Sequence, residues 1–353
     1  MKIKFVILAN ERADDHYLWI QACEKFREQV SYRVADLTSD NWFEEIRSEP
    51  FNILLAKPGG VTSSFKQLYD ERIYILGKTL QYRIYPSPDE IFIYENKRFL
   101  SFWLKANKIS HPETHVFYNI AEAEKFLKGG TYPVVGKVNI GASGSGVAIL
   151  KDLNEATKYL KQIFSDKGAR RRHGPNFTIG GWGKRALFYL MNPFSLSSKI
   201  ELYKTIGRDK QKDFAIFQEY IPHSFEWRVV RVGNSFYAHK KLKSGDKASG
   251  ALLKSYCDPP SGLLDFVKGI TDRHNFFSQA VDIFESERGY LVNEMQCIFG
   301  QSDPHQMIVN GKPGRYIFFD SKWVFEEGDF NSNESYDARV LWLIDKYGDQ
   351  QPR

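Results

Sequence analysis

The amino-acid sequence predicts an α/β protein of the α+β kind, in which a small parallel sheet precedes larger antiparallel ones. Strand-like apolar runs alternate with helical patterns in residues 1–95, as in βαβ units. Two further strand-like runs flank a glycine-rich loop in residues 132–150. From residue 214 onward, strand-like runs follow one another through tight turns, which favours an antiparallel sheet with helices on one face.

The composition is that of a soluble globular protein. Of the 353 residues, 42% are hydrophobic and 26% charged, and this balance excludes a disordered or fibrous chain. The first apolar run is short and charges soon return, so we expect a first strand in residues 1–10 and not a signal peptide or membrane span. The expected location is cytoplasmic, without a membrane partner. Three cysteines far apart, with no C-x-x-C pair, predict neither a disulfide framework nor a zinc site.

The first unit continues with a helix over residues 15–30 and strands over 32–37 and 51–60. A second helix is expected within residues 94–114, where Phe99, Phe102, Trp103 and Ala106 mark an apolar face.

The middle of the chain predicts, in order, a strand at 115–120, a helix at 121–130, strands at 132–138 and 147–150, and a helix at 154–164. Residues 165–213 are irregular and basic, which predicts an insertion over the surface. Much of the net charge of +6 lies here and near Lys241. Such patches suit an anionic small molecule as readily as nucleic acid. A short arginine run without a recognition fold is usually a solvated face, so nucleic acid is the less favoured partner.

The last part predicts strands at 214–222, 226–233, 235–242, 279–286 and 289–296, with helices at 265–275 and 336–348. The final helix is amphipathic and can pack on its own domain, which we favour, or on a partner in a homodimer. We therefore expect three parts: an N-terminal domain of residues 1–95, a central lobe of 96–216 and a C-terminal lobe of 217–353.

The glycine loop lies between two strands and follows Lys137. It matches neither the G-x-x-x-x-G-K-[ST] template nor G-x-G-x-x-G between a strand and a helix. Glycines let successive backbone N–H groups turn towards an anion, so the hairpin can close over phosphates as a flap. The alternative is an ordinary hairpin.

Two carboxylates and an amide are expected to converge near the end of the chain. Glu294 and Gln296 are two residues apart on a strand and share a face, and Asp282 lies on the preceding strand. Oxygen ligands of this kind suit Mg²⁺. Salt bridges on a solvated face are the alternative. Because Glu294 lies within an apolar run, where an unpaired charge is costly, we favour the metal site.

An apolar strand reaching Gln218, Glu219, Tyr220 and Ile221 and then turning at a proline exposes backbone groups beside apolar side chains, which suits a purine edge. Glu226, seven positions after Glu219, can accept hydrogen bonds from ribose hydroxyls. A plain strand with a proline turn and a solvent-facing Glu226 is the alternative.

Together these motifs, in order over roughly residues 70–310, resemble the ATP-grasp superfamily. Residues 94–114 resemble its first lysine and helix, 132–150 its second lysine and glycine loop, and 217–242 its adenine hinge and arginine strand. Residues 281–300 resemble its metal pair. The 12-residue separation of Asp282 and Glu294 is similar to that of relatives that join amino acids to carboxylates.

The resemblance implies an ATP-grasp fold with two ATP-clamping lobes behind the N-terminal domain, and a role for each matching residue. The implied ATP ligands are Lys97 and Lys137 at the α- and β-phosphates, Ser143, Gly144, Ser145 and Gly146 over the triphosphate, Gln218, Glu219, Tyr220 and Ile221 at adenine, and Glu226 at ribose. The implied Mg²⁺ ligands are Asp282, Glu294 and Gln296, and the implied catalytic residues are Arg228 and Lys241. Arg228 is expected to face the transferred phosphate or the substrate carboxylate. Gln296 replaces the usual asparagine, and the basic insertion is larger than is typical.

The activity implied is ATP-dependent ligation of a carboxylate to an amine through an acyl phosphate. The alternatives are a kinase that phosphorylates a hydroxyl and a non-catalytic ATP-binding regulator. Further candidates for contact with the acceptor are Lys240, Ser249, Asn10 and Glu11. The basic insertion favours an anionic acceptor, such as a uronic-acid sugar, a nucleotide-linked sugar or an acidic peptide, in peptide or surface-glycan metabolism.

Overall fold

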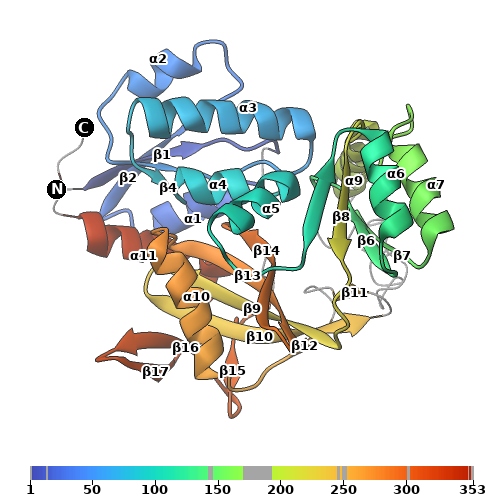
Figure 1. The fold of residues 1–353 in the computed structure, drawn as a ribbon. Helices are drawn as coiled ribbons and strands as arrows, with labels where there is room; N and C mark the ends of the chain where they lie inside the picture. Colours follow the sequence, from blue (N-terminus) through green and yellow to red (C-terminus); the bar gives the residue numbers. More distant parts are fainter. Residues whose placement is uncertain are drawn as a thin grey trace.

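The computed structural model describes residues 2–12, 15–141, 146–169, 193–244, 247–248, 253–299, 303–348 and 350. Its three sheets form three parts of the molecule (Figure 1). Within the described ranges, no helix is both long enough and apolar enough to cross a membrane.

The N-terminal part is a parallel sheet with strand order β2-β1-β3-β4. Its strands are β1 (Ile3–Leu8), β2 (Val30–Ala35), β3 (Ile53–Leu55) and β4 (Ile84–Tyr85), and its helices are α1 (Tyr17–Lys25), α2 (Trp42–Arg47), α3 (Ser63–Tyr74, continued by the π-helix η1, Ile75–Thr79) and α4 (Pro88–Ile93). Since β1 pairs in parallel with both β2 and β3, the βαβ arrangement expected from the sequence is present.

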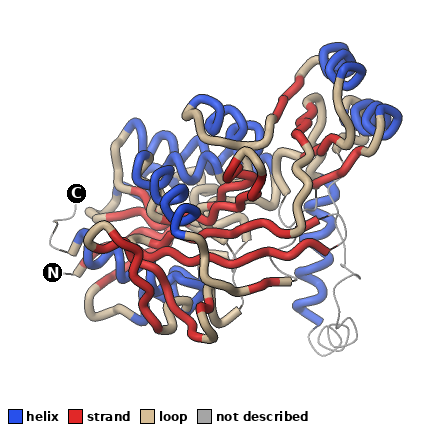
Figure 2. The backbone as a smooth tube through the Cα atoms, turned by 60° about the horizontal axis from the view of Figure 1, so that its bottom comes forward, coloured by secondary structure: helices blue, strands red, loops and turns tan. Residues whose placement is uncertain are grey.

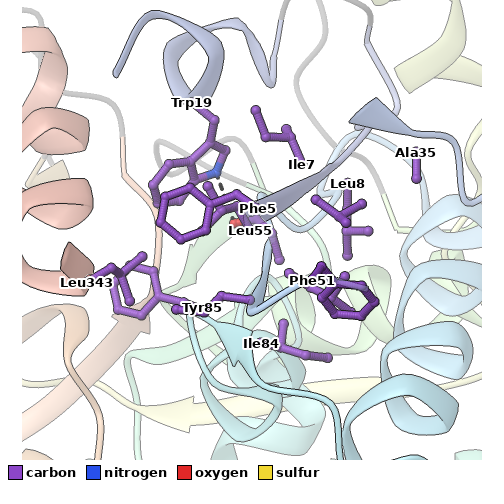
Figure 3. Close-up of a cluster of buried hydrophobic side chains, with 14 of the residues drawn as sticks. Phe5, Ile7, Leu8, Trp19, Ala35, Phe51, Leu55, Ile84, Tyr85 and Leu343 are labelled. Atoms are coloured by element: carbon purple, nitrogen blue, oxygen red, sulfur yellow. Dashed lines mark hydrogen bonds between the residues drawn. The ribbon is translucent and has the colours of Figure 1, made fainter. Parts of the chain in front are cut away.

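The core of this part includes a helix from the other end of the chain. Figure 3 shows the ring of Trp19 beside Phe5 and Tyr85, with Leu343 of α11 (Tyr336–Tyr347) at the same cluster. The indole Nε1 of Trp19 donates to the carbonyl of Ala56 at 3.3 Å. The final amphipathic helix therefore packs within its own chain, against the N-terminal sheet.

The helix that follows, α5 (Lys97–Ala106), buries a different face from the one expected. Leu100 and Leu104 pack into the core, whereas Phe99 is 42% and Phe102 56% exposed. The expected apolar face was therefore wrong for Phe99 and Phe102, whereas Trp103 packs against the same core as the leucines. Residues four apart share a helix face, and here the face that meets the neighbouring sheet is the leucine one, although the aromatic side chains are larger.

The central part is an antiparallel sheet with strand order β5-β8-β6-β7. Its strands are β5 (Thr114–Phe117), β6 (Val134–Lys137), β7 (Val147–Leu150) and β8 (Ala215–Glu219), and its helices are α6 (Ile120–Gly129) and α7 (Leu153–Ile163). The basic segment expected to be irregular contains α9 (Pro193–Arg208) in its described portion, so that expectation was wrong there. Its arginine run at residues 170–172 lies outside the described residues.

The third part is a nine-stranded sheet with main order β14-β13-β9-β10-β16-β15. Its strands are β9 (Phe225–Val232), β10 (Ser235–Ser244), β11 (Lys247–Ala248), β12 (Lys254–Ser255), β13 (Ser278–Ser286), β14 (Gly289–Gln296), β15 (Ile308–Val309), β16 (Lys312–Phe319) and β17 (Lys322–Glu327); the short helix η2 (Ser332–Ser335) precedes α11. Its pairings are antiparallel, as the sequence predicts. The strands run as long red segments across the molecule in Figure 2.

The two faces of this sheet differ in character. Trp227 and Val229 point to an apolar core shared with α10 (Ser261–Arg273) and with α5. Because side chains alternate along a strand, Arg228 points to the opposite face. That second face carries the charged residues that the sequence singled out.

Candidate functional site

Charged side chains gather where the central sheet meets the second face of the nine-stranded sheet. They come from α5, β6 and four neighbouring strands of the large sheet. The charged residues are Lys97, Lys137, Glu226, Arg228, Lys241, Asp282 and Glu294, and the neutral amide of Asn293 links two of them. We call this set the buried charge cluster.

Asp282 holds two cations at once. It lies opposite Arg228 in the register of β13 and β9, and its carboxylate accepts from Arg228 Nε at 2.7 Å and Nη2 at 2.8 Å. Lys241 Nζ donates to the same carboxylate at 2.7 Å. Burial would raise the pKa of Asp282, but Arg228 and Lys241 outweigh it and hold the pKa well below its usual range. Asp282 is therefore an anion at any physiological pH.

A chain of hydrogen bonds continues from Lys241 to the central sheet. Lys241 Nζ donates to Glu226 at 2.8 Å, Asn293 Nδ2 donates to Glu226 at 3.2 Å, and Lys137 Nζ donates to Asn293 Oδ1 at 2.9 Å. Glu226 is buried, so the solvent-facing alternative for this residue was wrong. Burial lowers the pKa of Lys137 to about 8, against the opposing effect of Glu294.

A β-bulge turns two neighbouring residues of β14 towards the cluster. Asp282 pairs with Glu294 and Ile283 pairs with Val292, so Asn293 is the extra residue on β14. Asn293 contacts Lys137, and Glu294 lies 3.2 Å from Lys97 Nζ. Alternation alone would place them on opposite faces, and for this reason the sequence analysis missed Asn293.

Glu294 is the more accessible of the two carboxylates. Its side chain is 23% exposed, against 3% for Asp282. Burial would raise the pKa of Glu294, but Lys97, Lys241 and Lys137 together outweigh this effect and lower it. Gln296, two residues along β14, shares the face of Glu294 and pairs with Ala280.

The base of the glycine loop is fixed by buried polar side chains. Lys97 Nζ donates to the carbonyl of Gly141 at 3.1 Å, and the amide of Gly141 donates to Glu95 at 2.9 Å. Gln211 bonds both the amide and the carbonyl of Ile140, each at 2.8 Å. The sequence gives no role to Glu95 or Gln211, and their contacts with the loop are seen only in the fold.

Gly146 closes the hairpin for a steric reason. Its carbonyl accepts from the amide of Val138 at 2.9 Å, and an added Cβ would lie 2.0 Å from Val138 Cγ2. Ser143, Gly144 and Ser145 lie outside the described residues.

The expected adenine segment runs from the end of β8 towards β9. Gln218 Nε2 donates to Thr114 Oγ1 at 3.0 Å, and the phenol oxygen of Tyr220 accepts from Lys243 at 3.3 Å. Ile221 packs with Phe284 and Leu291 of the large sheet.

The side chain of Glu219 reaches the turn between β13 and β14. Arg288 Nη2 donates to its two oxygens at 2.8 and 2.7 Å. The expected adenine segment therefore lies at the junction of the two sheets.

Some acceptor candidates lie apart from the cluster. The ammonium of Lys240 lies over the rings of Phe225 and Trp227, 4.2 and 4.9 Å from their centroids, on the opposite face from Lys241. Glu11 accepts from the amides of Val61 and Thr62 at 3.1 and 3.2 Å, ahead of α3.

The next candidate, Asn10, accepts through Oδ1 from the amide of Glu11 at 2.6 Å. Ser249 lies outside the described residues.

The donors expected to bind Mg²⁺ fit that ion chemically. Asp282 and Glu294 lie opposite one another across paired strands, and both are ionised. Mg²⁺ takes one or two carboxylates and completes its shell with water and phosphate oxygens. Among the described residues there is no group of three or more His, Cys, Asp or Glu side chains arranged to hold a metal, so the expected set rests on these two acids and the amide of Gln296.

Comparison with known proteins bears on the fold. No family model and no curated protein sequence matches the chain. Among solved structures, a RimK-domain ATP-grasp protein from Sphaerobacter thermophilus has a TM-score of 0.50 at 15% identity, covering 85% of this chain and 93% of its own. The chain has the ATP-grasp fold. Carboxyaminoimidazole ribonucleotide synthase from Aspergillus clavatus, complexed with ATP, has a TM-score of 0.51 at 11% identity, covering 85% of this chain and 71% of its own.

The ATP-grasp fold that the ordered motifs predict is thus confirmed. At these identities the likeness is one of fold, and the roles of individual residues stay predictions. In this ATP-grasp fold the buried charge cluster lies between the central and large sheets, and it unites Lys97, Lys137, Arg228, Asp282 and Glu294, which the sequence places far apart.

Proposed function

We propose that this protein is an ATP-dependent carboxylate–amine ligase that forms an amide through an acyl phosphate and releases ADP and phosphate. The observation that carries the proposal is the buried charge cluster at the junction of two sheets. Four of its side chains are cations and three are carboxylates: Lys97, Lys137, Arg228 and Lys241, with Glu226, Asp282 and Glu294.

Buried charges are a weak means of stabilising a fold, since taking ions out of water costs several kcal/mol for each, by rough estimate. A cluster that spans two sheets is better explained by a charged ligand that it must recognise. The cations suit a polyphosphate, and the carboxylates suit the divalent ion that accompanies it. Two structural neighbours are complexes with ADP and with ATP, which supports a nucleotide as the ligand.

Lys97 and Lys137 are proposed to hold the α- and β-phosphates, because Lys137 ends the strand before the glycine loop and Lys97 donates to the carbonyl of Gly141 in that loop. Arg228 is proposed to stabilise charge as the substrate carboxylate oxygen attacks the γ-phosphorus and the bond to ADP breaks. Asp282 fixes the guanidinium plane of Arg228 through two hydrogen bonds. Mg²⁺ held by Asp282, Glu294 and Gln296 would withdraw charge from the phosphate oxygens.

The second half of the reaction joins the amine. Its nitrogen attacks the acyl carbon, the carbon–oxygen bond to phosphate breaks, and phosphate leaves with the proton. The hairpin of β6 and β7 is proposed to exclude water that would hydrolyse the acyl phosphate. An anionic acceptor, such as a uronic-acid sugar or an acidic peptide, remains our proposal from the basic charge of the chain.

The test is release of ADP and phosphate from Mg²⁺-ATP. The panel pairs carboxylic acids, including uronic acids and acidic dipeptides, with amino acids and aliphatic amines. We expect release that needs one acid and one amine and is lost in Glu294→Gln. Glu287→Gln is the matched control, because Glu287 is exposed in the turn of the same hairpin. Release with a hydroxyl acceptor alone would indicate a kinase, and ATP binding without turnover would indicate a regulator; either result contradicts the proposal.

A further inference from the structure

His239 lies at the boundary between the buried charge cluster and an apolar patch of the same sheet face. It is on β10, opposite Arg228 and two residues before Lys241. On the other side, Tyr237 belongs to an apolar group with Val230. The His239 side chain has no exposed surface.

Hydrogen bonding defines the tautomer of His239. Its Nδ1 lies 2.9 Å from the carbonyl oxygen of Gln306. Because a carbonyl only accepts, Nδ1 carries the proton and Nε2 presents a lone pair. Burial lowers the pKa of His239 to about 3, helped by Arg228 and Lys254, so the ring stays neutral. Nε2 is therefore a hydrogen-bond acceptor at physiological pH.

This acceptor has no donor in the described part of the chain. Nε2 of His239 is buried and makes no hydrogen bond. Gln306, which binds the other nitrogen, presents a second buried acceptor without a donor, its Oε1, while its Nε2 donates to Asn331 at 3.1 Å. An unsatisfied buried acceptor costs about 1–3 kcal/mol. Two in adjoining residues beside a charged cluster indicate a site that receives donors from outside.

We propose that His239 is a positioning residue for the amine substrate, whose N–H groups it accepts through Nε2, with Gln306 Oε1 as a second acceptor of the same subsite. This inference rests on the ligase function proposed above. It assigns the amine to the part of the site beside Arg228 and Lys241, next to the expected acyl phosphate. A carboxylate or phosphate brings lone pairs and no donors, so it fits these two acceptors poorly.

The step that His239 serves is nucleophilic attack. An amine that donates one N–H to Nε2 has its lone pair directed elsewhere, and the subsite turns that lone pair to the acyl carbon. The new carbon–nitrogen bond replaces the carbon–oxygen bond to phosphate, and the N–H proton leaves with phosphate. His239 keeps its protonation state throughout, so it acts by orientation and not as a base.

Two substitutions distinguish the roles of the two ring nitrogens of His239. Asparagine at this position retains a donor near Nδ1 for the Gln306 carbonyl and removes the acceptor at Nε2. Glutamine places an amide oxygen near Nε2. Steady-state kinetics of His239→Asn and His239→Gln are measured with the most active acid of the panel, with its amine partner, and with hydroxylamine as a small amine probe.

We expect His239→Asn to raise the KM for amine about tenfold, the effect of about one hydrogen bond, with the KM values for ATP and acid changed less than about twofold. His239→Gln should recover part of the amine KM. An equal rise in all three KM values, or an unchanged amine KM, would overturn the inference.

An amine-free reaction separates this inference from the proposed function. Reversible acyl-phosphate formation scrambles ¹⁸O in the β–γ bridge of ATP when acid alone is present. His239→Asn should scramble at the wild-type rate, which also shows that it folds. Loss of scrambling in this variant would overturn the positioning role. Absence of scrambling in the wild type would instead refute the ligase proposal itself.

Discussion

Replacing Asp282 with asparagine removes the anion that two buried cations share. Lys241 keeps Glu226 as a partner at 2.8 Å, but Arg228 loses the carboxylate that accepts both of its hydrogen bonds. Asp282 raises the Arg228 pKa against burial. The ordinary pKa of arginine is so high that the guanidinium stays charged in the variant, without this partner. Removing one partner of a buried ion pair costs about 3–5 kcal/mol, and we expect Asp282→Asn to fall in this range.

The assay is urea unfolding followed by circular dichroism, compared with two further variants. Arg288→Gln removes a half-exposed partner of Glu219 and should cost roughly 0–1 kcal/mol. The double variant Asp282→Asn/Arg228→Met leaves no unpaired guanidinium. Its loss of unfolding free energy should be about 2 kcal/mol smaller than the sum of the losses in the two single variants. A cost below about 1 kcal/mol for Asp282→Asn would refute the view that Asp282 neutralises the cluster.

Three other predictions concern the hairpin, the second lysine and the domain junction. Gly146→Ala should weaken ATP binding, because the new Cβ meets Val138, and adding Val138→Ala to the same chain should restore it. ATP affinity is measured by calorimetry, and a double variant that binds no better than Gly146→Ala would contradict the steric account. The pKa of Lys137 is about 8, and bound phosphate would raise it, so ATP binding at pH 8.5 should take up as much as about three quarters of a proton. This proton uptake is measured by calorimetry in buffers of different ionisation enthalpy, and it should be absent in Lys137→Met. Glu90 of α4 lies at the junction with the large sheet, where its carboxyl group accepts from the amide of Ser278 of β13 at 2.9 Å. Burial raises the pKa of Glu90 from 4.5 to about 7, so its stabilising effect is complete below pH 4.5 and is lost as pH rises through 7. Relative to Glu90→Gln, the wild type should lose roughly 3 kcal/mol of unfolding free energy over that interval in urea unfolding, and parallel pH profiles would contradict this.

The ordered motifs were enough to predict the fold, because each combines a residue type with a local pattern that survives at low identity. Lys97, Lys137, Asp282 and Glu294 could be singled out for the same reason. Alternation along β10 places Lys240 and Lys241 on opposite faces, so of these two candidates only Lys241 can reach the cluster.

Other features depend on tertiary packing and are not written in local patterns. The bulge at Asn293 breaks the alternation of β14, and only the pairing with β13 reveals it. The face of α5 that is buried depends on the sheet it meets, so the size of Phe99 and Phe102 does not predict their burial. The sequence gives His239 no role, since a lone histidine in an apolar strand is usually a core residue. Its unsatisfied Nε2 becomes visible only with its neighbours in place.

Capture of the acyl phosphate by hydroxylamine tests the central claim most directly. The protein is incubated with Mg²⁺-ATP, hydroxylamine and each acid of the panel, and hydroxamate and ADP are measured by mass spectrometry and a coupled assay. We predict that one class of acid yields hydroxamate and ADP in equal amounts, and that Glu294→Gln yields neither. ADP formed with an acid but without hydroxamate, or with a hydroxyl acceptor in place of an acid, would contradict the account.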